Sequence, residues 1–124
     1  MEEFNKKSTL ILGASTKPNR YAYMAAHRLS EAGHPIVMVA KRSGVLLGEE
    51  IYDHKIDYEG IDTITLYLNP KNQVEYYDYI LSLNPKRVIF NPGTENEELY
   101  AVLNKNNISY TEACTLVLLS IDKY

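Results

Sequence analysis

The sequence has no tryptophan and a single cysteine, Cys114, so no disulfide can form within the chain. No apolar run approaches the roughly 18 residues that a membrane-spanning helix needs, and we expect no membrane span. Basic residues are not in excess: 13 Lys and Arg stand against 16 Asp and Glu, and the net charge of -3 argues against a general nucleic-acid-binding surface. The N-terminus, MEEFNKKS, starts acidic and lacks an apolar core, so we expect no signal peptide. These absences favour a cytoplasmic protein.

The composition that remains is that of an ordinary globular protein. Hydrophobic residues make up 45% of the 124 positions and charged residues 23%. A chain of this length buries roughly two thirds of the surface that it exposes when unfolded, which is enough for a core. No repeat or linker divides the chain, so we expect a single domain over 1–124.

Short apolar runs alternate with segments of helical spacing. The runs predict five buried strands, at 9–13, 36–40, 61–68, 86–90 and 108–110. Helices are predicted after Pro18, which suits a first helical turn, over 74–81, and after Thr94, where Glu97 completes a capping box. Gly33 is a stop signal for the first helix. The segment 41–60 is expected to be irregular, and 114–121 is apolar enough for either a helix or a strand.

The alternation predicts an α/β protein with a three-layer, Rossmann-like fold: a five-stranded parallel sheet with helices on both faces. We expect the strand order 3-2-1-4-5 and right-handed crossovers. Open parallel sheets bind ligands beyond the carboxyl ends of their strands. The segments at those ends are 13–20, 40–44, 68–71 and 91–94.

The first of these segments, GASTKPNR, has features of an anion-binding loop. Gly13 permits a tight turn directly after the strand, and the helix that follows presents free N–H groups and a positive dipole end. Lys17 and Arg20 add positive charge, and an arginine can bind a phosphate through two parallel hydrogen bonds. The loop is neither a P-loop nor a complete dinucleotide fingerprint, so a plain strand-to-helix turn remains an alternative.

The second segment carries charge of the opposite sign to an NAD site. NAD-binding domains place an acidic residue after the second strand, where it binds the ribose hydroxyl. Here that strand runs into Lys41 and Arg42. A basic pair suits a ribose that carries a phosphate, as in coenzyme A (CoA) or NADP. The alternative is two solvated cations on a surface loop.

Several motifs resemble those of the CoA-binding domain family, which is itself similar to the Rossmann domain of succinyl-CoA ligase. They are GAS with a following proline and arginine, then GEEIY, DTITLYLNP, FNPGTENEEL and ACTLVLL, in family order over nearly the whole chain. The resemblance implies binding of CoA or an acyl-CoA, with no catalytic activity attached to the stand-alone domain. The chain departs from the family at Val39–Arg42, where relatives often have Pro-Val-Asn-Pro, and at Phe90–Pro92, where many have Trp and Gln.

The resemblance also assigns binding residues. It implies that the diphosphate is held by Gly13, Ala14, Ser15, Thr16, Lys17, Arg20 and Tyr21. Ala40, Lys41 and Arg42 would lie near the adenosine and its 3′-phosphate. Leu68, Asn69 and Pro70 would flank the adenine or the diphosphate, and Asn91, Pro92 and Gly93 would follow the pantetheine arm.

No catalytic constellation is visible in the sequence. Cys114 is expected to be a buried, inert thiol, and the alternative is a thiol close to the CoA sulfur. Histidine pairs and cysteine clusters are missing, so we expect no metal site. We therefore expect a small-molecule-binding protein that is not an enzyme, with CoA as its ligand and a homodimer among its expected forms. An NADP-dependent enzyme or regulator and a ligand-free interaction module remain alternatives.

Overall fold

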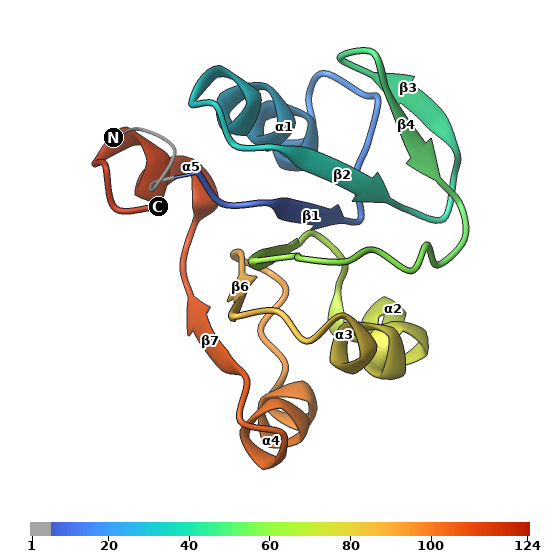
Figure 1. The fold of residues 1–124 in the computed structure, drawn as a ribbon, viewed down its shortest axis with the longest axis vertical. Coiled ribbons are helices and arrows are strands. Elements are labelled where there is room, and N and C mark those ends of the chain that lie inside the picture. Colours follow the sequence, from blue (N-terminus) through green and yellow to red (C-terminus); the bar gives the residue numbers. More distant parts are fainter. Residues whose placement is uncertain (1–5) are drawn as a thin grey trace.

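The structure, a computed structural model, describes residues 6–124. The first five residues, on which the signal-peptide prediction partly rests, lie outside that range. A single sheet crosses the described chain (Figure 1). Its strands are β1 (Thr9–Leu12), β2 (Ile36–Val39), β3 (Gly44–Leu46), β4 (Glu49–Tyr52), β5 (Thr63–Leu66), β6 (Arg87–Phe90) and β7 (Ser109–Glu112).

The sheet has seven strands where the sequence predicted five. Their order is β3-β4-β2-β1-β5-β6-β7, and every neighbouring pair is parallel except the hairpin of β3 and β4. The predicted order was wrong because it placed the strand at 61–68 beside β2, whereas β5 pairs with β1. The place beside β2 belongs to β4, whose Ile51 is in register with Met38. If β3 is left out and the six parallel strands are renumbered from 1 to 6 along the chain, their order across the sheet is 3-2-1-4-5-6.

Helices cover both faces of the sheet, as the alternation predicted (Figure 1). They are α1 (Tyr21–Glu31), α2 (Pro70–Gln73), the 3-10 turn η2 (Val74–Tyr76), α3 (Tyr77–Leu83), α4 (Glu97–Lys105) and α5 (Thr115–Ser120). One apolar cluster joins the sheet to α1 through Ala25 and Leu29, and Leu116 and Leu119 of α5 pack against it. The other joins it to α3 and α4 through Ile80, Leu99 and Leu103. Within the described residues no helix is both long and apolar enough for a bilayer crossing.

Three helix starts differ from the predictions. The helix predicted over 74–81 is divided into η2 and α3, and α2 precedes it from Pro70. α1 begins at Tyr21, because Pro18 and Asn19 form a turn in which the Arg20 N–H donates to the Lys17 carbonyl (3.0 Å). α4 is capped by Asn96, whose side-chain oxygen accepts from the N–H groups of Glu98 and Leu99. Thr94 instead donates its hydroxyl to the Asn91 carbonyl (2.7 Å). Asparagine is a stronger cap than threonine, and this preference moves the helix start by two residues.

Candidate functional site

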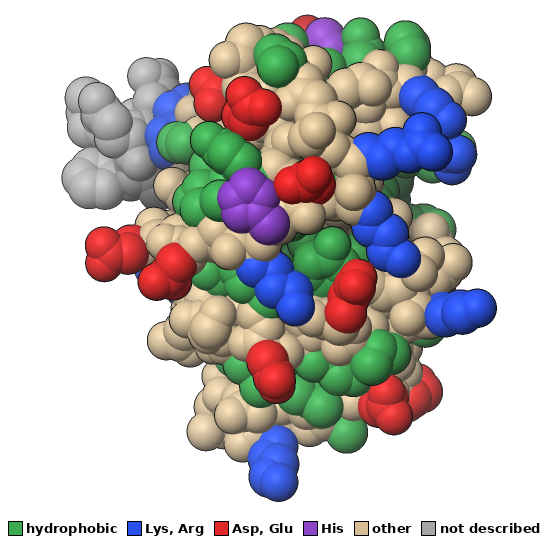
Figure 2. All heavy atoms as spheres, turned by 90° about the vertical axis from the view of Figure 1, so that its right-hand side faces the viewer, with side chains coloured by type: hydrophobic (Ala, Val, Ile, Leu, Met, Phe, Trp, Pro, Cys, Tyr) green, Lys and Arg blue, Asp and Glu red, His purple; other side chains and the backbone are tan. Residues whose placement is uncertain are grey.

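A cleft lies at the carboxyl-end edge of the sheet. Its volume is about 850 Å³, and the segments that follow β1, β2, β5 and β6 line it. Figure 2 shows the molecule from the side of this edge. Several Lys and Arg side chains gather on the right of that view, beside a hollow. The lining residues are Gly13–Lys17, Asn19–Ala22, Ala40–Ser43, Ile51, Tyr67–Asn69 and Pro92–Thr94.

The first wall of the cleft depends on Gly13. Its φ of +97° lies in the left-handed region that side chains disfavour, and its N–H donates to the Val39 carbonyl (2.8 Å). A Cβ at this position would stand 3.0 Å from the side chain of Leu68 and from the backbone carbonyl carbon and oxygen of Tyr67. Only glycine therefore lets the loop after β1 cross so close to the segment after β5.

The N-terminus of α1 opens into the same cleft. Arg20 occupies the N-cap position but makes no capping hydrogen bond with its side chain. The first N–H groups of a helix have no partner within the helix, so those of Tyr21 and Ala22 are available to an anion. Upstream, the Ser15 hydroxyl accepts from the Lys17 N–H (3.0 Å), which holds the loop in a turn.

Four cationic side chains surround the cleft: Lys17 and Arg20 on one wall, and Lys41 and Arg42 after β2. All four residues are exposed. The Lys41 ammonium donates to the Asn72 side-chain oxygen (2.9 Å). Neither ion pair found among residues 6–124 involves any of the four. Among the described residues, no Asp or Glu lines the cleft, so cations outnumber anions in its lining although the whole chain carries a net charge of -3.

The far rim of the cleft is the turn after β6. Pro92, Gly93 and Thr94 line it, and Gly93 adopts a φ of +94°. The Gly93 N–H donates to the side chain of Glu95 (2.9 Å). The Thr94 N–H donates to the Asn91 carbonyl (2.9 Å), so the turn is closed by its own backbone.

Tyr67 lines the cleft, and its phenol lies near the side chains of Thr65 and Thr115. Burial raises the pKa of Tyr67 to about 12, against the opposing influence of hydrogen bonding with Thr65 and Thr115. The phenol therefore stays protonated at neutral pH and can donate a hydrogen bond.

The structure brings most of the predicted site residues together: all of them except Pro70, Asn91 and Cys114 line the cleft. Pro70 is the first residue of α2. The Asn91 amide points into the protein, where it donates to the Thr65 hydroxyl (2.7 Å) and accepts from the Thr115 N–H (2.8 Å). Cys114 is a partly buried free thiol at the N-cap of α5, not the fully buried residue that was expected.

Asn19 lines the cleft as part of the predicted segment 13–20. Five further lining residues were not assigned to the site from the sequence: Ala22, Ser43, Ile51, Tyr67 and Thr94. Ser43 and Thr94 lie in the strand-end segments, where position alone could have found them. Ile51 had no such signal, because it lies in β4, within the segment that was expected to be irregular.

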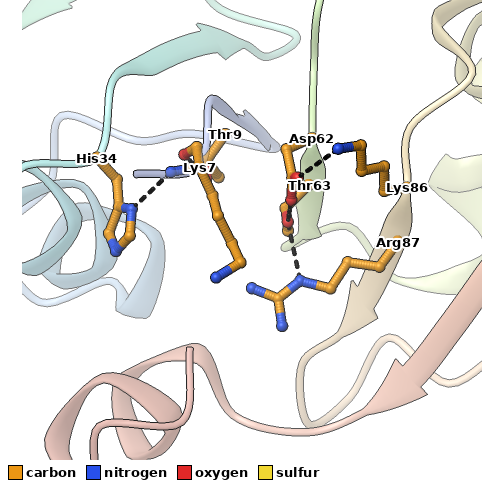
Figure 3. A network of polar contacts seen from close by, with 7 residues as sticks. All are labelled: Lys7, Thr9, His34, Asp62, Thr63, Lys86 and Arg87. Carbon is orange, nitrogen blue, oxygen red and sulfur yellow. Dashed lines mark hydrogen bonds and ion pairs between the residues drawn. The ribbon is translucent and has the colours of Figure 1, made fainter. Parts of the chain in front are cut away.

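The opposite edge of the sheet has a separate polar network (Figure 3). The Arg87 side chain donates to the Thr63 hydroxyl (2.8 Å), and that hydroxyl donates to the Asp62 carboxylate (2.7 Å). Nδ1 of His34 accepts from the Lys7 N–H (3.0 Å), which requires a ring without a proton on that nitrogen. Burial lowers the pKa of His34, and the positive charge of Lys7 lowers it further. Within residues 6–124, no three His, Cys, Asp or Glu side chains are grouped to hold a metal ion.

Solved structures similar to this chain confirm the fold. A crystal structure of an uncharacterized protein shares 54% identity with a TM-score of 0.94, over 96% of this chain and 98% of that one. A structure from Thermus thermophilus shares 21% identity (TM-score 0.85, 99% and 94% covered). A hypothetical protein from Pyrococcus horikoshii OT3 shares 24% (TM-score 0.84, 94% and 88%). At these two lower identities the likeness concerns the fold alone.

Family membership rests on a different comparison. No protein of curated function matches the chain. The family model described as "CoA binding domain" matches residues 7–120, which is nearly the whole chain. The resemblance found in the motifs is therefore confirmed, and the chain belongs to the CoA binding domain family.

Proposed function

We propose that the protein binds coenzyme A or an acyl-CoA in the cleft at the carboxyl ends of β1, β2, β5 and β6. One observation carries the proposal: four cations and the uncapped start of α1 line a single cleft to which no described carboxylate contributes. Such a cleft selects a small molecule with several phosphates, because each phosphate finds either a cation or free N–H groups.

Under this proposal the diphosphate of CoA lies against the loop after β1. The Tyr21 and Ala22 N–H groups bind its oxygens, and the positive end of the α1 dipole stabilises its charge. Arg20 is the main charged partner, because its exposed guanidinium stands at the helix start and makes no capping bond. Gly13 serves the site indirectly, by letting the loop pass close to Tyr67.

Lys41 and Arg42 then bind the phosphate on the ribose of CoA. Both line the cleft at the end of β2, where NAD-binding domains have an acid. NADP also carries a phosphate on its adenosine ribose, so the same pair makes NADP a second candidate ligand. The two candidates differ at their other end, where CoA has a pantetheine arm and NADP a nicotinamide.

We also propose that the protein binds its ligand without transforming it. Among the described residues, no His, Cys, Asp or Glu lines the cleft, so the usual general bases and the thiol nucleophile are not among the lining side chains. A carrier, sensor or regulator that responds to CoA is consistent with such a lining.

Thermal unfolding with a matched panel of ligands tests the proposal. The panel is CoA, acetyl-CoA, dephospho-CoA, NADP, NAD and ATP, each at the same concentration and ionic strength. A ligand that binds only the folded state at 100 times its Kd stabilises it by about 2.7 kcal/mol. We expect CoA or acetyl-CoA to raise Tm most. A larger shift with NADP would favour the second candidate, and no shift with any member would reject a nucleotide site.

A further inference from the structure

A buried glutamine connects the two segments that form one side of the cleft. Gln73, in α2, is fully buried. Its Nε2 donates to the Leu68 carbonyl and to the Thr94 carbonyl, both at 2.8 Å. Leu68 belongs to the segment after β5 and Thr94 to the segment after β6, and both line the cleft. One side-chain amide therefore spans two rims that are 26 residues apart in the chain.

The acceptor side of the same amide is also occupied. Gln73 Oε1 accepts from Nδ2 of Asn96 (2.8 Å), the N-cap residue of α4. This partner fixes the orientation of the amide, because the flipped amide would direct its oxygen at two carbonyl oxygens. The brace formed by Gln73 and Asn96 thus links α2, the two rims and the start of α4.

We infer that Gln73 is a positioning residue for the cleft: it does not line the cleft, yet it sets the distance between the Leu68 rim and the Thr94 rim. Without it, two backbone carbonyls in a water-poor environment lose their donor. They then turn toward solvent, and the rims separate. The inference rests on the proposed function, because a change in the spacing of the rims lowers the affinity only for a ligand that contacts both of them.

The test compares three variants and measures the stability of each beside its affinity. Gln73→Met keeps the bulk of the side chain and removes all three hydrogen bonds. Leu103→Ala is the control, because Leu103 is fully buried in α4 and does not line the cleft. Asn96→Ser is a milder second variant, since serine still caps the helix but cannot reach Gln73 with an amide. Urea unfolding establishes the stability of each, and calorimetric titration with CoA gives its Kd.

We expect the Kd for CoA to rise at least tenfold in Gln73→Met and about threefold in Asn96→Ser. The Leu103→Ala variant should stay within twofold of the wild type. Similar Kd values in Gln73→Met and Leu103→Ala would overturn the inference. If Gln73→Met does not fold, an Asn96→Ser variant with unchanged Kd would overturn it as well.

Hydrogen exchange separates failure of this inference from failure of the proposed function. The Thr94 N–H is buried and bonded to the Asn91 carbonyl, so it reports the order of its rim without any ligand. If the wild type does not bind CoA, faster exchange at Thr94 in Gln73→Met than in Leu103→Ala still supports the brace. Equal exchange in the two variants would reject it.

Discussion

Replacement of Arg20 by alanine separates a binding role from a structural one. Arg20 is exposed, caps α1 without a side-chain bond and takes part in neither ion pair of the described chain. Its backbone N–H contact to Lys17 survives the substitution. We therefore expect the free energy of unfolding to change by no more than about 0.5 kcal/mol.

The loss of affinity should be much larger than the loss of stability. A hydrogen bond to a charged group contributes about 1.5–3 kcal/mol, and about 1.4 kcal/mol corresponds to a factor of ten in Kd. If Arg20 binds the diphosphate, CoA affinity should fall about tenfold to a hundredfold. The salt dependence of binding should also become weaker, because one screened charge contact is missing.

Titration with CoA at two salt concentrations, together with urea unfolding, measures both effects. Arg28→Ala is the matched control, because Arg28 is exposed in the last turn of the same helix and lies outside the cleft. That control loses a favourable dipole interaction of about 0.3–1 kcal/mol and should keep its CoA affinity. Unchanged affinity in a folded Arg20→Ala variant would refute the role of Arg20 in binding the diphosphate. A loss of stability without a loss of affinity would make Arg20 a structural residue.

Three further predictions follow from other parts of the structure. Lys41→Ala should remove most of the preference for CoA over dephospho-CoA, which we expect to be about tenfold to a hundredfold in the wild type. If paired titrations of the variant still show that preference, Lys41 is not the partner of the 3′-phosphate. Leu47→Asn should raise the free energy of unfolding, measured in urea, by about 0.5–1 kcal/mol. Leu47 is exposed and has a φ of 56°, a left-handed conformation that strains leucine and that asparagine tolerates better. A loss of stability in the variant would show that the backbone at Leu47 is not strained. His34, whose pKa is lowered from its usual 6.5, should make the protein less stable as the pH falls through about 6.5, since the unfolded state then binds more protons than the folded state. His34→Gln should flatten that part of the stability profile, and an unchanged slope would assign it to other groups.

The local features of the fold were predictable because each has a local physical cause. Buried parallel strands appear as apolar runs, and β1, β2, β5 and β6 all coincide with predicted ones. The end of α1 was predicted from Gly33, which adopts the positive φ of a helix terminus (+87°). The strand order has no local cause, since it is decided by which segments pair across the sheet. The Glu-Glu-Ile-Tyr sequence of β4 exposes all but Ile51, so it carries no apolar run that could reveal a strand.

The same contrast between local features and strand pairing explains which parts of the cleft could be predicted from the sequence. Parallel strands end at one edge, so the segments after them were certain to converge once the sheet was predicted. Ile51 reaches the cleft for another reason: it lies in β4, and the β3–β4 hairpin folds back beside β2. The packing is tight at Gly44, where a Cβ would stand 3.0 Å from the Thr16 side chain. The hairpin thus borders the loop after β1 directly, and a wrong strand order necessarily leaves this wall of the cleft out.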